Sequence, residues 1–217
     1  MKIGILGSGR MGGHLGRMFA GVGHEVVFSY ARDAAKLARL AEQAGPGTRA
    51  GSPAEAVADA DLVLLAVHWL RVDDVLAQAG DLGGKTVISC CVPLDAGDAE
   101  LVVAHTCSGA EVLARRLPDA HLVAAFQSTP SELLPRAFDA RAAAVRPSVV
   151  FCGDDAGSKV RVAGLIDQIG FDPVDAGALR VARYIEPFGM LSAVLAYSTD
   201  QGPAWAYRFG RIDRLIG

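Results

Sequence analysis

Residues 2–13, KIGILGSGRMGG, join a hydrophobic run to a glycine-rich turn. Gly7, Gly9 and Gly12 have the G-x-G-x-x-G spacing, which alone is weak evidence for a nucleotide site. Here the motif directly follows a hydrophobic strand and opens an amphipathic helix, within a β-α-β unit of about thirty residues. This context predicts a dinucleotide-binding turn rather than an ordinary glycine-rich one.

Each glycine of this turn has a physical task. Gly7 lets the chain leave the strand sharply, Gly9 keeps side chains away from a pyrophosphate, and Gly12 lets the helix pack closely on the sheet. The start of the helix then offers unpaired N–H groups and a partial positive charge to the pyrophosphate. The residues expected to line this cradle are Gly7, Ser8, Gly9, Arg10, Met11 and Gly12.

The end of the next strand selects between the two nicotinamide dinucleotides. An NAD site places Asp or Glu about twenty residues after the glycines, where it binds the ribose hydroxyls. Residues 25–36, EVVFSYARDAAK, instead place Ser29, Tyr30 and Arg32 at the strand end, with Lys36 one turn into the next helix. A hydroxyl and a guanidinium bind a 2′-phosphate that a carboxylate would repel. This pattern predicts NADP(H); the alternative is that Arg32 only pairs with a nearby surface carboxylate.

Short β-branched runs alternate with amphipathic helices, which predicts a Rossmann-like α/β fold with a doubly wound, mostly parallel sheet. We expect residues 1–177 to form an NADP-binding domain and residues 178–217 a helical extension packed on its cofactor-binding end, as one globular unit. Pro173 marks an edge strand, and Pro187 is expected to break or kink the last helical segment. Strands are expected at 2–6, 25–30, 48–50, 61–67, 85–90, 121–126, 148–152 and 171–177, and helices at 11–22, 33–44, from Pro53, at 70–79, from Asp155 to Ile169, and at 178–215.

The composition argues against several functional classes. The chain has 217 residues, of which 51% are hydrophobic and 21% charged, and its 21 lysines and arginines are scattered, so no nucleic-acid surface is expected. The longest apolar runs are too short to cross a bilayer and no signal core precedes the first strand, so we expect a cytoplasmic protein with no membrane partner. The four cysteines lack a C-x-x-C spacing, so we expect reduced structural thiols and no metal site.

Beyond the glycine turn, the sequence resembles the NADPH-dependent reductases of coenzyme F420, an 8-hydroxy-5-deazaflavin, and the bacterial oxidoreductases related to them. The resemblance covers nearly the whole chain. It rests on GSGRMG (7–12), GHEVVFSYAR (23–32), LLAVHW (64–69), VPL (92–94), AFQSTP (125–130), FCGDDAGSK (151–159) and PVDAGALRVAR (173–183). It implies direct hydride transfer between NADPH and a deazaflavin or flavin-like small-molecule acceptor, with catalysis mainly by positioning two flat rings. It also implies a homodimer, which the apolar stripe of the last helix favours.

Carried over residue by residue, the resemblance implies a 2′-phosphate site at Ser29 and Arg32. His68 and Gln127 depart from the family, which usually has proline at the first position and Asn or His at the second. The resemblance therefore specifies the cofactor better than the acceptor. The residues it implies around the nicotinamide are Ala66, Val67, His68, Trp69, Cys91, Val92, Pro93, Gln127, Ser128, Thr129 and Pro130.

Two groups of polar residues follow strands and are candidates for chemistry. His68 is the candidate catalytic residue, as a proton donor to the acceptor, and Trp69 would wall the pocket; alternatively His68 caps the next helix and Trp69 packs on it. Gln127 and Thr129 suit the nicotinamide carboxamide or the acceptor ring. Besides hydride transfer to a deazaflavin, the sequence leaves open the reduction of an imine or carbonyl, and a non-catalytic NADP(H) sensor.

Overall fold

The structure is a computed structural model of the chain and describes residues 1–31 and 33–210. Strands and helices alternate along most of it. The strands are β1 (Lys2–Leu6), β2 (Glu25–Ser29), β3 (Thr48–Ala50), β4 (Leu62–Leu65), β5 (Thr86–Ser89), β6 (His121–Ala125), β7 (Ser148–Gly153) and β8 (Asp172–Asp175). The α-helices are α1 (Arg10–Gly21), α2 (Ala34–Ala44), α3 (Pro53–Ala58), α4 (Val72–Ala79), α5 (Gly109–Arg116), α6 (Leu133–Asp139), α7 (Ala156–Gln168) and α8 (Ala182–Tyr197), and the 3-10 turns η1 (Trp69–Arg71) and η2 (Leu179–Val181) precede α4 and α8.

All the strands form one 8-stranded sheet in the order β3-β2-β1-β4-β5-β6-β7-β8. The strands from β3 to β6 run parallel, whereas β7 pairs antiparallel with β6, and β8 runs parallel to β7. The strand order reverses between β1 and β4. The expected Rossmann-like, mostly parallel α/β class is confirmed, and β8, which contains Pro173, is the edge strand that the sequence predicted.

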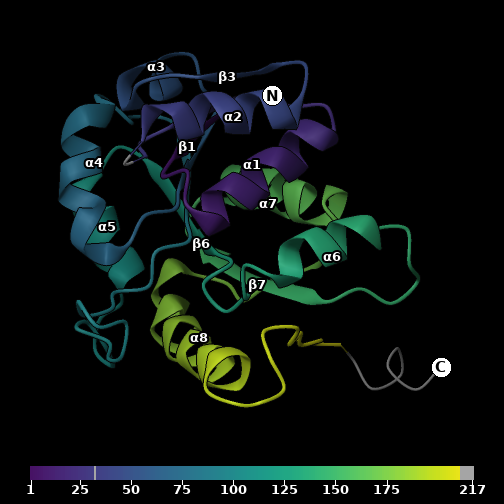
Figure 1. Cartoon of the computed structure of the whole chain (residues 1–217). Helices are drawn as coiled ribbons and strands as arrows, with labels where there is room; N and C mark the ends of the chain where they lie inside the picture. Colours follow the sequence, from purple (N-terminus) through teal and green to yellow (C-terminus); the bar gives the residue numbers. More distant parts are fainter. Residues whose placement is uncertain (32, 211–217) are drawn as a thin grey trace.

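Helices cover both faces of the sheet (Figure 1): α1, α2, α6 and α7 lie on one face, and α3, α4 and α5 on the other. The alternation of side chains along a strand divides β4 between the two cores. Leu62 and Leu64 belong to the core beneath α1, and Val63 and Leu65 to the core beneath α3 and α4. A strand buried on both faces reads as a continuous apolar run, as LVLL does.

Side-chain caps fix the starts of two of the helices that the sequence predicted. Ser52 and Glu55 form a capping box at α3, whose first residue is Pro53. At α7, the Asp155 carboxylate accepts a hydrogen bond from the backbone N–H of Ser158 (2.7 Å). Asp155 therefore caps its helix.

The C-terminal part differs from the expectation in two respects. First, α8 is a single helix that continues through Pro187. This proline removes only the bond that its N–H would have made to the carbonyl of Arg183, in the first turn of the helix. Second, no helix follows α8 within residues 198–210, where Gly202 has a φ of 75° and Pro203 follows it. The rest of the expected helix, residues 211–215, lies outside the described residues.

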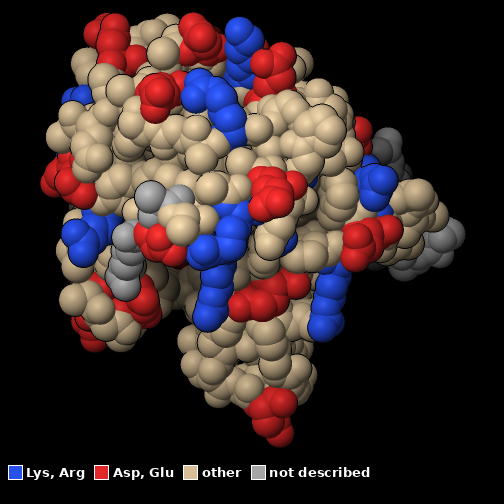
Figure 2. Space-filling view, turned by 45° about the horizontal axis from the view of Figure 1, so that its top comes forward, with Lys and Arg blue, Asp and Glu red and all other residues tan. Residues whose placement is uncertain are grey.

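The surface carries both signs of charge. Figure 2 shows acidic and basic side chains interspersed over the visible face, in keeping with the formal net charge of −3. Within residues 1–31 and 33–210, no helix has the length and apolarity needed to cross a membrane.

Candidate functional site

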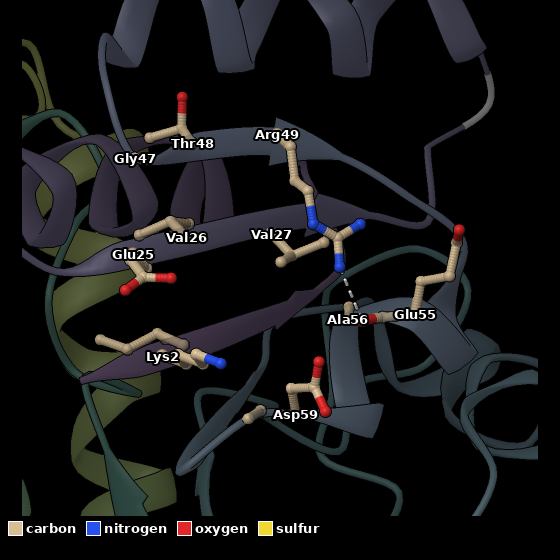
Figure 3. A pocket seen from close by; sticks show the side chains of 12 residues that line it. Lys2, Glu25, Val26, Val27, Gly47, Thr48, Arg49, Glu55, Ala56 and Asp59 are labelled. Atoms are coloured by element: carbon tan, nitrogen blue, oxygen red, sulfur yellow. Dashed lines mark hydrogen bonds between the residues drawn. The ribbon is translucent and has the colours of Figure 1, made fainter.

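Two hollows compete as candidate sites. One, of about 330 Å³, lies at the amino ends of β1, β2 and β3 beside α3. Figure 3 shows Arg49 reaching across it to α3, where its guanidinium donates to the carbonyl oxygen of Glu55 (3.3 Å). The other, of about 520 Å³, lies at the carboxyl ends of β1, β4, β5 and β6. Open α/β sheets bind ligands at the carboxyl ends of strands, where strand order reverses, so the second hollow is the candidate site and is called the cleft below.

Besides α8, five parts of the chain form walls of the cleft. These are the glycine turn at residues 9–11, the end of β4 at residues 66–68, Cys90 after β5, Asp98, and the turn at residues 127–131 after β6. One face of α8 closes it from the opposite side. That face presents Gly189, Ser192, Ala193 and Tyr197.

The glycine turn has the conformation that its sequence predicts. Gly7 has a φ of 110°, and a Cβ on Gly12 would come within 1.9 Å of the Gly7 carbonyl oxygen. A Cβ on Gly9 would meet no atom within 4 Å, so the space in front of this residue is open. The first intrahelical bond of α1 runs from the N–H of Gly13 to the carbonyl of Gly9 (2.9 Å), so the preceding amides have no partner within the helix. The turn therefore has the room and the donors that a pyrophosphate requires.

Two serines expected near the phosphates are buried. The Ser29 hydroxyl donates to the carbonyl of Ile5 (2.7 Å), and the Ser8 hydroxyl donates to the carbonyl of Ser29 (2.9 Å). These bonds tie β1, β2 and the glycine turn together. In this structure neither hydroxyl faces solvent, and the expectation that the Ser29 side chain meets a 2′-phosphate is not what the geometry shows.

Tyr30 directly follows β2, with a φ of 56°, and turns the chain toward α2. Its hydroxyl donates to the carboxylate of Asp74 on α4. Burial, followed by the hydrogen bond and the charge of Asp74, raises the pKa of Tyr30 to about 12, and the positive charge of Arg71 acts in the opposite direction. The phenol is thus a neutral donor already bound to a carboxylate. No sequence motif predicts this contact, which joins positions 44 residues apart.

The basic residues expected beside Tyr30 are only partly within the described structure. Arg32 lies outside the described residues. Lys36 is exposed on the first turn of α2. Asp33 caps α2 by accepting from the N–H of Ala35 (2.9 Å), and it pairs with Arg39 at 3.2 Å.

His68 lies in the wall of the cleft with both ring nitrogens engaged. Its Nδ1 accepts a hydrogen bond from the backbone N–H of Leu70 (3.2 Å), so His68 caps η1. Because Nδ1 accepts, the proton of the neutral ring is on Nε2, which donates to the Asp98 carboxylate at 2.8 Å. The structure therefore shows the capping arrangement, with the single ring proton held by Asp98.

The expected residues near the nicotinamide separate into two groups. The structure brings Ala66, Val67 and His68, together with residues 127–130, to the cleft. It leaves four outside the lining: Trp69, Cys91, Val92 and Pro93. Trp69 packs in the core of the α3–α5 face, where the Arg116 guanidinium lies 5.8 Å from its ring centroid.

Cys91 is buried and Cys90 takes its place in the lining of the cleft. The Cys91 thiol donates to the carbonyl of Val67 (3.2 Å), and burial raises its pKa to about 11. Burial also raises the pKa of the Cys90 thiol. Both are therefore thiols rather than thiolates at neutral pH. In the described part of the chain, no three His, Cys, Asp or Glu side chains gather as a metal site.

The turn after β6 carries polar groups without partners. Phe126 has a φ of 69°, and its carbonyl accepts a bond from the N–H of Thr129 (3.1 Å). Gln127 is 8% exposed and Thr129 5% exposed. Within the described residues, neither the amide nitrogen and oxygen of Gln127 nor the Thr129 hydroxyl has a hydrogen-bond partner. Buried polar groups of this kind are rare in proteins, and in a cleft wall they indicate a ligand.

Sequence reasoning missed a set of contacts at the mouth of the cleft. The Tyr197 hydroxyl donates to Oε2 of Glu132 (2.6 Å), and the other carboxylate oxygen of Glu132 lies 3.4 Å from the guanidinium of Arg10. These contacts link the glycine turn, the turn after β6 and α8. Tyr197 was visible only as part of an apolar stripe, and Glu132 carried no motif.

Comparisons with known proteins show which proteins the chain is similar to. Residues 2–93 match the sequence profile of a family described as NADP oxidoreductase, coenzyme F420-dependent. The match covers less than half of the chain. The match to the F420-dependent family includes the glycine turn, the end of β2 and the end of β4, so the expected resemblance is confirmed.

Single proteins extend the similarity over the whole chain. A crystal structure from Arthrobacter sp. FB24, of a candidate F420-dependent NADP reductase, has a TM-score of 0.84 and 25% identity, and covers 97% of this chain and 100% of that one. The metalloreductase STEAP3 of Rattus norvegicus is 29% identical over 185 residues, which are 85% of this chain but 36% of the relative. The chain thus spans about a third of that relative's length.

A more distant structure shares the fold alone. The reductive aminase of Aspergillus terreus in complex with NADPH has a TM-score of 0.63 at 20% identity, covering 89% of this chain and 61% of that one. Taken together with the family match, these findings place the chain among the NADP-dependent oxidoreductases.

Proposed function

We propose that this protein transfers hydride between NADPH and a deazaflavin or flavin-like acceptor in the cleft. The observation that carries this proposal is that one cleft joins two kinds of wall. On one side is the open helix start at Gly9, suited to a pyrophosphate, and on the other are the unpaired polar groups of Gln127 and Thr129. Its volume of about 520 Å³ suits a flat ring system beside a nicotinamide.

The chain's own residues would hold the dinucleotide in an extended form across β1 and β4. The backbone amides around Gly9, Arg10 and Met11 bind the pyrophosphate, and Arg32 with Lys36 binds the 2′-phosphate, an assignment that rests on sequence and family. Residues 66–68 and Cys90 then border the nicotinamide. When bound, the nicotinamide supplies a hydride, and the net reaction converts NADPH, a proton and the oxidised acceptor into NADP⁺ and the reduced acceptor.

The protein's contribution to the rate is mainly positioning. The cleft would hold the nicotinamide beside the acceptor ring and keep water from them, and such orientation can supply a large share of a barrier reduction. His68 is our candidate for delivering the proton to the acceptor. To do so, the ring must first take up a second proton at Nδ1, giving up the bond from Leu70, and its Nε2–H must turn from Asp98 to the acceptor; otherwise the proton comes from solvent.

The relatives support this choice of acceptor. The structure that matches over the full length of both chains is a candidate F420-dependent NADP reductase. STEAP3 is a metalloreductase, so a related chain serves a different final acceptor. We infer that the NADPH half of the reaction is shared and that the acceptor side varies.

The test is anaerobic mixing of the protein with NADPH and one oxidised acceptor at a time. Coenzyme F420 is compared with FMN, riboflavin, a ferric chelate and a cyclic imine, and the loss of NADPH absorbance is followed. We expect turnover with the deazaflavin to exceed that with the imine by at least about tenfold, since ring stacking rather than acid catalysis drives the reaction. Turnover of the imine alone, or NADPH binding without turnover of any acceptor, would overturn the proposal.

A further inference from the structure

Contacts with other parts of the chain hold the turn after β6 in a fixed conformation. Phe126, a bulky residue, has a φ of 69°, a conformation that costs free energy and persists where the surroundings enforce it. Two contacts brace the turn: the Ser128 hydroxyl bonds the Tyr207 hydroxyl at 2.6 Å, and a Cβ on Gly189 would come within 2.7 Å of the Gln127 carbonyl oxygen. The C-terminal segment and α8 thus hold Gln127 in place from two directions.

The braced turn presents a side chain whose hydrogen bonds are unmade. The Gln127 amide carries a donor and an acceptor side by side, and both are buried without a partner in the described residues. Thr129 adds a buried hydroxyl two residues on, beside the Tyr207 hydroxyl that bonds Ser128, and its hydrogen-bond geometry leaves it unpaired. Leaving such groups unpaired destabilises the fold, so their natural partner is a ligand with matching groups.

We propose that Gln127 and Thr129 recognise the imide edge of the acceptor ring, an N–H group flanked by two carbonyl groups. This inference rests on the proposed function and names the part of the acceptor that the cleft recognises. The Gln127 amide oxygen accepts from the ring N–H, its NH₂ group donates to a neighbouring carbonyl, and the Thr129 hydroxyl donates to a carbonyl oxygen. Flavins and deazaflavins share this edge.

The position of Gln127 favours the acceptor, rather than the nicotinamide carboxamide, as the group that its side chain binds. The pyrophosphate cradle lies at the end of β1, and β4, β5 and β6 follow it across the sheet. Gln127 follows β6, which lies three strand spacings of about 4.8 Å from β1 and its cradle. It is one spacing beyond the end of β5, where Cys90 is assigned to the nicotinamide. An imine or a simple ketone has one polar atom and would leave part of the amide unpaired.

The test compares two flavin probes that differ by one methyl group. Lumiflavin has a free imide N–H, and 3-methyllumiflavin has that position blocked. Their dissociation constants are measured by fluorescence in the presence of saturating NADP⁺, with the wild-type chain and Gln127→Met. Gln168→Met is the matched control, because Gln168 bonds His24 at 2.8 Å, away from the cleft.

We expect wild type and Gln168→Met to bind lumiflavin at least about tenfold more tightly than the methylated probe. In Gln127→Met the two probes should bind equally, both more weakly than lumiflavin binds wild type, while the Kd of NADP⁺ changes less than about threefold. Gln127→Glu, which keeps the shape and loses the NH₂ donor, serves if the Met variant does not fold. It should weaken lumiflavin binding by about tenfold.

Two results would overturn the inference. One is equal binding of both probes by wild type, and the other is loss of NADP⁺ affinity in Gln127→Met with lumiflavin binding unchanged. These failures differ from failure of the proposed function, which is absence of turnover with F420 or flavins while the probe discrimination persists.

Discussion

Gly9 differs from its motif partners Gly7 and Gly12 in what a side chain would meet. A Cβ on Gly7 would lie 2.4 Å from the carbonyl oxygen of Ala66, and one on Gly12 would lie 1.9 Å from that of Gly7, whereas one on Gly9 enters open space. Substitution of Gly7 or Gly12 therefore disturbs folding. Substitution at Gly9 affects only what approaches the helix start.

We predict that Gly9→Val folds normally but loses dinucleotide binding. Its melting temperature should stay within a few degrees of wild type, while the Kd of NADPH, measured by calorimetry, rises at least about a hundredfold as the pyrophosphate is displaced. Gly164→Val on α7, where a Cβ also meets nothing within 4 Å, is the control and should bind normally. Normal NADPH binding by Gly9→Val would place the pyrophosphate elsewhere.

Arg32 tests the choice of dinucleotide. We predict that Arg32→Glu weakens NADPH binding at least about tenfold and NADH binding less than about threefold, because only the former brings a 2′-phosphate to the new carboxylate. Titration of both dinucleotides against wild type and variant measures the difference. If the wild-type chain binds both equally, the selectivity assigned to this position is lost.

Glu132 pairs with Arg10, a residue of the expected pyrophosphate cradle. The two side chains lie 3.4 Å apart across the mouth of the cleft, with the Arg10 side chain largely exposed. We predict that Glu132→Gln binds NADP⁺ about two- to fivefold more tightly, since an exposed pair is worth up to about 1 kcal/mol. The gain should shrink in high salt, because exposed charges are screened. Glu42→Gln on α2 is the control; weaker binding by Glu132→Gln would mean that Glu132 supports the ligand.

Among single residues, the sequence predicted the glycine geometry but not the direction of Ser29. The spacing of the glycines fixes what each must do, because the task of a glycine depends on the backbone alone. The direction of Ser29 depends on the pleat of β2, which turns it to the same face as Val27 and beneath a helix. The unpaired amide of Gln127 is likewise a property of packing, which no local pattern encodes.

At the scale of elements, α8 is locked to α5 by charged groups. The carboxylate of Glu186, 1% exposed, accepts bonds from the backbone N–H groups of Gly109 (2.8 Å) and Ala110 (3.0 Å). Beside it, the Arg183 guanidinium donates two bonds to the Glu111 carboxylate, at 2.6 and 2.8 Å. Because α8 forms a wall of the cleft, this junction sets the shape of the site.

Glu186 makes the stability of this junction dependent on pH. Burial raises its pKa from 4.5 to about 7, against the opposing effect of the two N–H bonds. Between pH 4.5 and about 7, Glu186 is therefore protonated in the folded chain and ionised in the unfolded chain. The free energy of unfolding falls as pH rises through this window. The loss approaches about 3 kcal/mol above pH 7. The pKa of Glu111 is lowered to about 2, so the contribution of Glu111 to the free energy of unfolding changes only below this window.

We predict that urea unfolding of wild type shows this decrease between pH 5 and pH 8. Glu186→Gln, which keeps an acceptor oxygen for the α5 amides and cannot ionise, should lack the Glu186 part of the slope. Identical slopes for the two proteins would show that Glu186 does not titrate in this range.

The sequence analysis did not predict helices α5 and α6, for different reasons. The start of α5 has a readable signal, the capping box of Ser108 and Glu111, but it follows a long irregular segment and spans only 8 residues. In α6, Pro135 interrupts the LLPRAFD pattern and reads as a helix breaker. The antiparallel direction of β7 could not be predicted, because a buried apolar run has the same pattern in either direction.

For the whole molecule, the outer face of α8 is the surface that most needs an explanation. It exposes large apolar side chains: Tyr184 (68%), Leu191 (53%) and Val194 (50%). Residues 187–199 contain no charged residue. The opposite face of the helix is committed to the cleft, so a second copy packing on the outer face would also stabilise the wall of the site. We propose that the protein is a homodimer through this face.

We predict that Leu191→Glu combined with Val194→Lys converts the dimer into a monomer, measured by light scattering at micromolar concentration. Contiguous apolar surface of this kind marks interfaces, and charges within one oppose association. Val160→Glu, at an apolar side chain 74% exposed on α7, should leave the dimer intact. A monomeric wild type would refute the interface. A monomeric variant with weakened flavin binding would link the wall of the cleft to the partner subunit, because Ser192 and Ala193, which line it, lie between the two substituted positions.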